Sequence, residues 1–173
     1  MDTPRHLLVC ALGDQRLALP LMAVERVVWA VEVTPLPGAP QSVLGVINVE
    51  GRVVPVIDLR RRYGIPDREI DLADRFVIAR TSRRTVALLV DWADVVASPA
   101  GAFVRAEEVL PAAGPVREVI KGDDGLVLVY DPDVLLSLDE ARALDTLGNG
   151  AAEPVPGPGA NGGADGEGGS GEA

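Results

Sequence analysis

The sequence predicts a mainly β protein built from two related units, and three observations support this class. Short runs of Val, Ile and Leu are separated by turn residues every 8 to 12 positions, which is typical of a small barrel or sandwich. One pattern occurs twice, 69 positions apart, in residues 17–27 and 86–96. Helical signal is sparse along the rest of the chain. We therefore expect two β units that pack on each other.

A second pair of matching segments extends the repeat. Five positions of residues 46–58 return about 73 positions later in residues 119–131. These are Val46, Ile47, Val54, Val56 and Asp58, which match Val119, Ile120, Val127, Val129 and Asp131. One loop insertion would produce the four-residue drift between the two offsets. The repeat places an approximate division near residues 70–75, and it leaves open whether the units exchange strands.

Four hairpins are expected, each with turn residues between two apolar runs. The paired runs are residues 7–12 with 15–19, 43–49 with 52–59, 76–79 with 85–90, and 116–121 with 126–130. At Glu50 and Gly51 the glycine supplies the positive φ that a tight reversal needs. Pro55 has no backbone N–H to donate within the run of residues 52–59, so we expect that strand at an edge or at a bulge.

The connecting segments have their own signals. Residues 34–40 contain three prolines and should form a stiff extended crossover. Residues 60–63 should form one solvated helical turn that ends at Gly64, and residues 132–147 are the candidate long helix, with Asp131 as its N-cap. Asp58 holds the equivalent position in the first repeat, so we interpret both aspartates as caps rather than as a catalytic pair.

The last part of the chain differs in composition from the body. Residues 148–173 consist mostly of Gly, Ala, Pro and acidic residues, with Val155 as the one larger aliphatic residue. Such a segment buries too little apolar area to offset the entropy of ordering. We expect a folded body at residues 5–147 and a disordered tail at residues 148–173.

Charge and composition exclude several classes of partner. The net charge is −10, of which the tail carries −4, so the phosphate backbone of nucleic acids and anionic membranes are both repelled. No apolar stretch is long enough to span a bilayer, so direct membrane insertion is not expected. The single cysteine, Cys10, lies in an apolar run and should be buried. These features predict a reduced, cytoplasmic protein.

The sequence lacks the combinations of residues that catalysis or metal binding would need. His6 is the single histidine and has no partner constellation, and one His with one Cys does not make a zinc site. No phosphate-binding glycine motif follows a strand. We therefore expect no enzyme, no cofactor and no metal. A ligand-sensing or hydrolytic barrel is the competing class, and it would require a polar pocket with convergent titratable groups.

Two strands are apolar on both faces. Residues 86–90 and 126–130 carry apolar side chains at nearly every position, although a barrel strand normally has one solvated face. The second face must be covered, either by the other unit of this chain or by another protein.

Residues 35–64 contain the pattern N-x-x-G-x-x-V-P-x-x-D-L-R, which runs from Asn48 to Arg60. With this core they resemble the CheW family of chemotaxis coupling proteins. Residues 17–28, 86–96 and 126–136 resemble the family too, so the likeness covers about residues 5–147. The resemblance implies two packed, five-stranded, SH3-like β-barrels with a C-terminal helix, without enzymatic activity or cofactor.

The resemblance also implies the partners. It points to an adaptor that joins the cytoplasmic tip of chemoreceptors to the regulatory domain of a CheA-type histidine kinase, and so to the cytoplasm at receptor arrays. A rigid adaptor would pass a receptor shift on to the kinase. The alternative is an auxiliary CheW-like adaptor of a motility or other chemosensory-like pathway that binds one partner only.

Six partner-binding residues follow from the position of the motif near the groove between the barrels. They are Val24, Val27, Gly45, Asn48, Glu50 and Gly51. The two valines also fit plain core positions, and Gly51 also fits a plain turn glycine. Many members of the family have a basic residue at the place of Glu50. A reversed charge there opposes the usual acidic partner or selects a complementary one.

Overall fold

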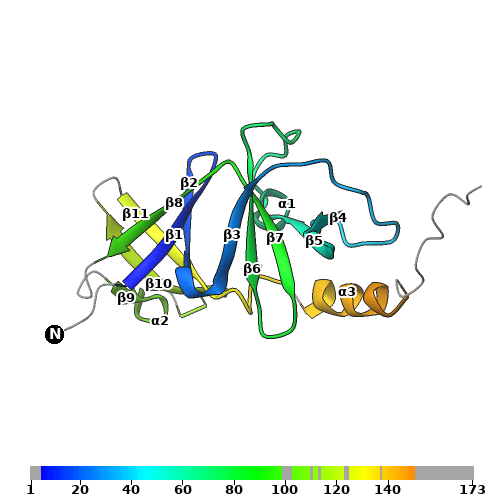
Figure 1. The fold of residues 1–173 in the computed structure, drawn as a ribbon. Helices are drawn as coiled ribbons and strands as arrows, with labels where there is room; N and C mark the ends of the chain where they lie inside the picture. The colour runs from blue at the N-terminus through cyan, green and yellow to red at the C-terminus, as the bar shows by residue number, and fades with distance from the viewer. Residues whose placement is uncertain are drawn as a thin grey trace, which may run out of the picture.

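The computed structural model describes residues 5–98, 103–109, 111–112, 114–122, 125–136 and 138–150. Within these residues the strands form two sheets that pack against each other (Figure 1). The five-stranded sheet has the order β3 (Val24–Trp29), β6 (Arg75–Arg80), β7 (Thr85–Val90), β5 (Arg52–Asp58) and β4 (Val43–Val49). The six-stranded sheet has the order β8 (Trp92–Ser98), β1 (Arg5–Leu12), β2 (Gln15–Pro20), β11 (Gly125–Tyr130), β10 (Val116–Gly122) and β9 (Phe103–Arg105). The predicted mainly β class is confirmed, with a sixth strand in one sheet.

Short helices connect the strands. A 3-10 turn, η1 (Leu21–Ala23), joins β2 to β3, and α1 (Leu59–Tyr63) follows β5. Helix α2 (Ala106–Val109) follows β9, and α3 (Leu138–Gly150) is the longest helix of the described residues. Asp58 caps α1 by accepting a hydrogen bond from the Arg60 amide at 2.9 Å, and Gly64 ends the helix in the left-handed region, as predicted.

The sequence repeat reappears in the strand pairing. Val56 on β5 pairs in parallel with Ala87 on β7, and the equivalent Val129 on β11 pairs in parallel with Ala18 on β2. The register shift between Val43 and Gly45 returns between Val116 and Glu118. The two sheets therefore share one pairing scheme, down to the position of the bulge.

Each sheet takes strands from both repeats. The hairpin β1–β2 pairs with β8 and β11, whereas β3, β4 and β5 pair with β6 and β7. The chain thus changes sheets between residues 20 and 24 and again between residues 90 and 92. Residues 70–75 lie within the stretch of chain that forms the five-stranded sheet. The division of the chain into two units near these residues stays a prediction.

Alternation along the strands divides the apolar side chains between two packing layers. On β1, Leu8, Cys10 and Leu12 enter a cluster with residues of both sheets, which we call the shared core, while Leu7 and Val9 pack within the six-stranded sheet. The shared core receives Val43, Ile57, Val77, Ala79, Val86, Leu88 and Val90 from the five-stranded sheet, and Leu59 from α1. The doubly apolar strand β7 is therefore covered by the other sheet of the same chain.

Burial of Cys10 follows from this arrangement. Its side chain is fully enclosed in the shared core, and burial raises the pKa of the thiol to about 12. Because the thiolate is the reactive form, this cysteine is inert near neutral pH, as the apolar run in the sequence predicted.

Pro55 fits one of the two predicted alternatives. Strand β5 is an interior strand between β7 and β4, so the edge alternative is wrong. The bulge alternative agrees with the register shift between Val43 and Gly45, which lies directly beside the pair of Pro55 with Val46.

The parallel pairing with β7 comprises Val56, Ile57 and Asp58, which begins directly after the proline. The missing donor of Pro55 therefore falls outside that pairing. On the other side Pro55 pairs with Val46, whose amide and carbonyl bond to Thr34 instead, so this pair needs no donor from Pro55.

The long helix begins later than predicted. Residues 132–134 form a turn in which the Asp131 carboxylate accepts from the Asp133 amide at 2.9 Å, and α3 starts at Leu138. The Leu135 carbonyl accepts from Nε of Arg62 at 3.0 Å, and the Leu135 side chain is buried in the shared core. These contacts hold the segment out of the helical path. Helix α3 runs on to Gly150, beyond the predicted end, and residues 151–173 lie outside the described residues.

Candidate partner-binding surface

The six predicted partner-binding residues lie on two strands and one turn of the five-stranded sheet. Val24 and Val27 belong to β3, Gly45 and Asn48 to β4, and Glu50 and Gly51 form the turn to β5. Strands β3 and β4 stand at opposite ends of the pairing order. The curvature of the sheet brings the two ends close enough for side chains to bridge them.

Two ion pairs make this bridge. Nη1 of Arg26 on β3 lies 2.7 Å from Oε1 of Glu50, and Nη2 of Arg52 on β5 lies 2.6 Å from Oε1 of Glu25. The hydrogen bond and the charge of Arg26 lower the pKa of the Glu50 carboxyl. Glu50 is therefore an ionised, exposed group whose charge is already partly matched inside the protein.

The turn itself explains two of the predicted residues. Glu50 and Gly51 both have positive φ, at 50° and 84°, which is the pattern of a type I′ hairpin turn. Oδ1 of Asn48 accepts a hydrogen bond from the Gly51 amide at 2.7 Å. Asn48 and Gly51 thus shape the tip that presents Glu50.

Gly45 has an internal reason to be glycine. It is buried, and its φ of 151° is unfavourable for other residues. A Cβ atom at this position would lie 2.7 Å from the carbonyl carbon of Thr34 and 2.9 Å from Cα of Pro35. Thr34 is held there by two hydrogen bonds with Val46, at 2.9 and 2.8 Å. The close backbone approach that a glycine permits is therefore made here by the chain's own crossover segment.

The two valines of β3 differ in exposure. Val24 is half-buried and packs against the shared core, whereas Val27 is 37% exposed. Two exposed apolar residues on the same elements were missed from the sequence, Trp29 on β3 and Val53 on β5, at 60% and 71%. Alternation would have located Val53, because its neighbours Val54 and Val56 are buried. Trp29 carries the guanidinium of Arg75 over its ring at 3.1 Å.

The equivalent edge strand of the other sheet is also apolar. On β8, Trp92, Val95 and Val96 are each between 43% and 50% exposed. Val96 is the repeat partner of Val27, and both lie on the first strand after a change of sheet. Both halves of the molecule thus expose apolar side chains on an edge strand, which is the composition of a docking surface.

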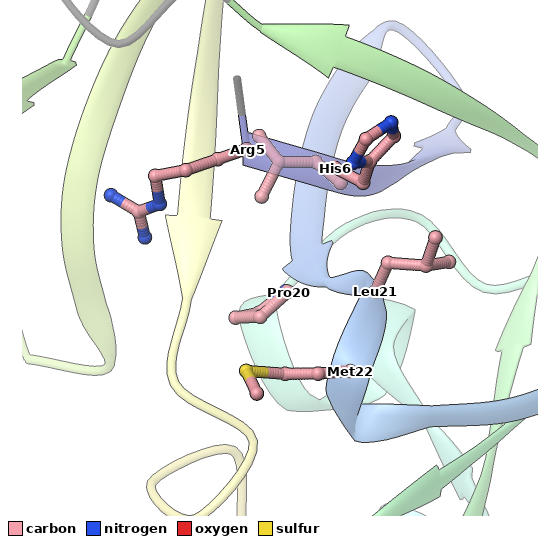
Figure 2. A pocket seen from close by; sticks show the side chains of 6 residues that line it. Arg5, His6, Pro20, Leu21 and Met22 are labelled. Carbon is pink, nitrogen blue, oxygen red and sulfur yellow. The ribbon is translucent and has the colours of Figure 1, made fainter. Parts of the chain in front are cut away.

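A shallow apolar cavity adjoins β3. It has a volume of about 450 Å³ and is lined by Arg5, His6, Leu7, Pro20, Leu21 and Met22. Figure 2 shows the guanidinium of Arg5 directed away from Pro20 and Met22, and Nη1 of Arg5 lies 3.0 Å from Oε1 of Glu118. His6 is the one further titratable group in the lining. The cavity suits an apolar side chain and lacks the convergent groups of a catalytic site.

A half-buried polar junction links the two sheets at Asp91, where the chain leaves β7 for β8. Its carboxylate accepts from Nη2 of Arg60 at 2.5 Å, from the Gly13 amide at 2.7 Å, and from Nη2 of Arg68 at 2.7 Å. Burial by itself raises the pKa of Asp91, but these hydrogen bonds and the charges of Arg60 and Arg68 hold that pKa below its ordinary value. The predicted solvated arginine turn is thus wrong for Arg60, which is 8% exposed.

Helix α3 adds a second tie. The carboxylate of Glu140 accepts from the hydroxyl of Ser42 and lies 3.6 Å from Nε of Arg62, while Asp145 pairs with Arg84. Leu144 enters the shared core. Together with the Asp91 junction, these contacts join both sheets into one body.

A metal site is not found in the described part of the chain, where no set of three or more His, Cys, Asp or Glu residues is placed to hold an ion. In the same residues no helix is long and apolar enough to cross a membrane.

Comparison with known proteins identifies relatives across the whole body. The profile of the CheW-like domain family matches residues 6–140. The chain is 38% identical over 87 residues to the chemotaxis protein CheW of Rhizobium meliloti, a match that covers 50% of this chain and 56% of that relative. The chain thus spans little more than half the length of this relative.

Two further likenesses extend the comparison. The crystal structure of the scaffolding protein TtCheW from Thermoanaerobacter tengcongensis has a TM-score of 0.72 and 26% identity, covering 80% of this chain and 96% of that one. Protein FrzA of Myxococcus xanthus is 31% identical over 107 residues, covering 57% of this chain and 67% of FrzA.

Proposed function

The chain belongs to the CheW-like domain family, and from this premise we propose that it is a non-enzymatic adaptor that couples chemoreceptors to a CheA-type histidine kinase in chemotaxis. The observation that carries the proposal is the match of the family profile to residues 6–140, which span both sheets. The partners would be the cytoplasmic tip of a receptor and the regulatory domain of the kinase, and the site of action the cytoplasm at receptor arrays.

The physical basis of coupling is rigidity. An adaptor transmits a receptor displacement only if its two binding surfaces keep a fixed relation, because a loose joint would absorb the displacement. The shared core and the Asp91 junction supply that fixed relation in this chain. The exposed apolar side chains of β3 and β8 supply docking area on both halves.

The predicted residues take different parts in the proposed receptor contact. Val27 would touch the partner directly, with Val24 at the border of the contact. Asn48 and Gly51 would set the shape of the turn, and Glu50 would present its charge. Gly45 would not touch the partner; it would support the surface indirectly, by allowing residues 34 and 35 to lie against β4.

Titration calorimetry tests the proposal directly. The full chain is titrated with the kinase regulatory domain and, separately, with a receptor cytoplasmic fragment from the same genome. We expect binding to both, and about tenfold weaker receptor binding in Val27→Glu, because a buried charge replaces an apolar contact. The control is Val104→Glu on β9, which is similarly exposed at 45% on the other sheet. Binding to neither partner would contradict the proposal.

The auxiliary adaptor with a single partner is the second candidate, and Glu50 and the likeness to FrzA favour it. If Glu50 selects against a standard acidic receptor, Glu50→Arg should increase receptor affinity. Because Arg26 then faces a like charge, the double variant Arg26→Glu with Glu50→Arg is the matched form that keeps the ion pair. Unchanged affinity in both variants counts against this candidate.

A further inference from the structure

A small basic cavity lies between the β6–β7 turn and the segment that leads into α3. Its volume is about 150 Å³. Thr81, Ser82, Arg83 and Arg84 line it from the turn, and Asp133, Leu136 and Ala141 line it from the other side. Neither the proposed adaptor function nor the repeat accounts for it.

The cavity has more cationic donors than acceptors. Arg84 pairs with Asp145, and Nη1 of Arg83 reaches the same carboxylate at only 3.8 Å, with the Arg83 side chain 63% exposed. Nε of Arg84 is buried and has no hydrogen-bond acceptor within the described part of the chain. Burial and the charge of Arg83 lower the pKa of Arg84, which is the effect expected where two guanidinium groups share too little negative charge.

The acidic groups near the cavity are already engaged. Oδ1 of Asp133 accepts from the Ser82 amide at 2.5 Å, and Asp145 serves both arginines. The lining itself carries two arginines and one aspartate, which is a local excess of positive charge on a protein of net charge −10.

A segment of opposite charge begins next to this cavity. Helix α3 ends at Gly150, five residues beyond Asp145, which is about 7–8 Å along a helix axis. Residues 151–173 follow, with Glu153, Asp165, Glu167 and Glu172 and without any Lys, Arg or His. A segment tethered so close is present at an effective concentration in the millimolar range.

We propose that the cavity beside Arg83 and Arg84 binds carboxylates of the chain's own acidic C-terminal segment, residues 151–173. Guanidinium groups bind carboxylates through charge-assisted hydrogen bonds, and the cavity is large enough for one carboxyl group. The contact is intramolecular and does not depend on the adaptor function. An acidic segment of another protein could bind here only by displacing the tail.

Paramagnetic relaxation enhancement in the full chain tests this contact. A nitroxide is attached at Ser170→Cys, and the buried Cys10 thiol, with its pKa of about 12, does not compete for the label. The enhancement is read at the amides of Ser82 and Arg83, with Gly13 and Asp14 in the equivalent turn of the other sheet as reference. The comparison chain has a neutral tail, with Glu153→Gln, Asp165→Asn, Glu167→Gln and Glu172→Gln.

We expect the enhancement at Ser82 and Arg83 to fall about threefold in the neutral-tail chain, as for the loss of weak exposed ion pairs. It should fall similarly in Arg83→Glu, while the charge-matched control Lys121→Glu on β10 leaves it unchanged. Equal enhancement in the native and neutral tails would overturn the proposal. So would a loss in Arg83→Glu without a loss in the neutral-tail chain, because the tail would then approach without its carboxylates.

Discussion

Gly45 offers the sharpest test of how the candidate surface is built. The substitution Gly45→Ala adds one methyl group at a buried position where the crossover residues 34 and 35 lie against β4. If Gly45 serves a partner, the variant should fold normally and bind poorly. If it serves the crossover, the variant should lose stability before any partner is present.

The size of the loss follows from the geometry. The new Cβ would lie 2.7 Å from the Thr34 carbonyl carbon, whereas ordinary contacts begin at 3.4 Å, so the crossover must move by about 0.7 Å or more. The two hydrogen bonds between Thr34 and Val46 would then be stretched or broken, at about 0.5–1.5 kcal/mol each. An unfavourable backbone conformation adds about 1–3 kcal/mol. The expected total is about 2–6 kcal/mol.

Urea and thermal unfolding of the purified protein measure this loss. At about 2–4 °C per kcal/mol for a chain of this size, the melting temperature should fall by roughly 5–20 °C. The matched control is Gly51→Ala, whose φ is 84° but whose Cβ would meet no atom within 4 Å. That control should lose only the conformational term of about 1–2 kcal/mol. If Gly45→Ala is no less stable than Gly51→Ala, the crossover argument is refuted.

Three further predictions concern the charged groups. The folded state holds the pKa of Asp91 below its ordinary value. The contribution of Asp91 to stability is therefore present above the unfolded pKa of about 3.9 and is lost as pH falls through the lower folded value. Urea midpoints at pH 6, 4 and 3 should show this decline. Asp91→Asn should lower the free energy of unfolding by about 2–3 kcal/mol near neutral pH, because Arg60 is left buried without its counter-charge. The stability of this variant should also fall less steeply in acid. An equally steep fall would contradict the role of Asp91. Glu50→Arg should lower the urea midpoint and Arg26→Glu added to it should restore the midpoint, whereas no recovery would show that the ion pair does not join β3 to the turn.

Local signals in the sequence predicted most of the strands. Gly51 marked the tight turn, Asp58 marked the start of α1, and Gly64 marked its end, because each of these effects acts within a few residues. The duplication was also visible, because equivalent positions keep a similar residue type; Ile47 and Ile120, for example, are both buried. Long-range pairing was not visible: nothing local in β2 indicates that it pairs in parallel with β11.

The misjudged elements share one cause. Pro55 was expected at an edge or at a bulge because a proline lacks a donor, but its strand is interior, and the short pairing with β7 begins one residue later. Arg60 was expected in solvent because runs of charged residues are usually solvated, but it forms an ion pair with Asp91, which lies between β7 and β8. The helix after Asp131 starts late because Arg62 takes the Leu135 carbonyl. In each case a residue far away in sequence overrides the local preference.

The candidate surface divides in the same way. The sequence alone determined the β class, the duplication and the family motif from Asn48 to Arg60, because these depend on residue type and short-range order. Tertiary structure decided which motif residues are accessible: Val27 is exposed, Gly45 is buried beneath residue 34, and Glu50 is held by Arg26. Accessibility is a property of the packed molecule, since it depends on which distant segment covers each residue.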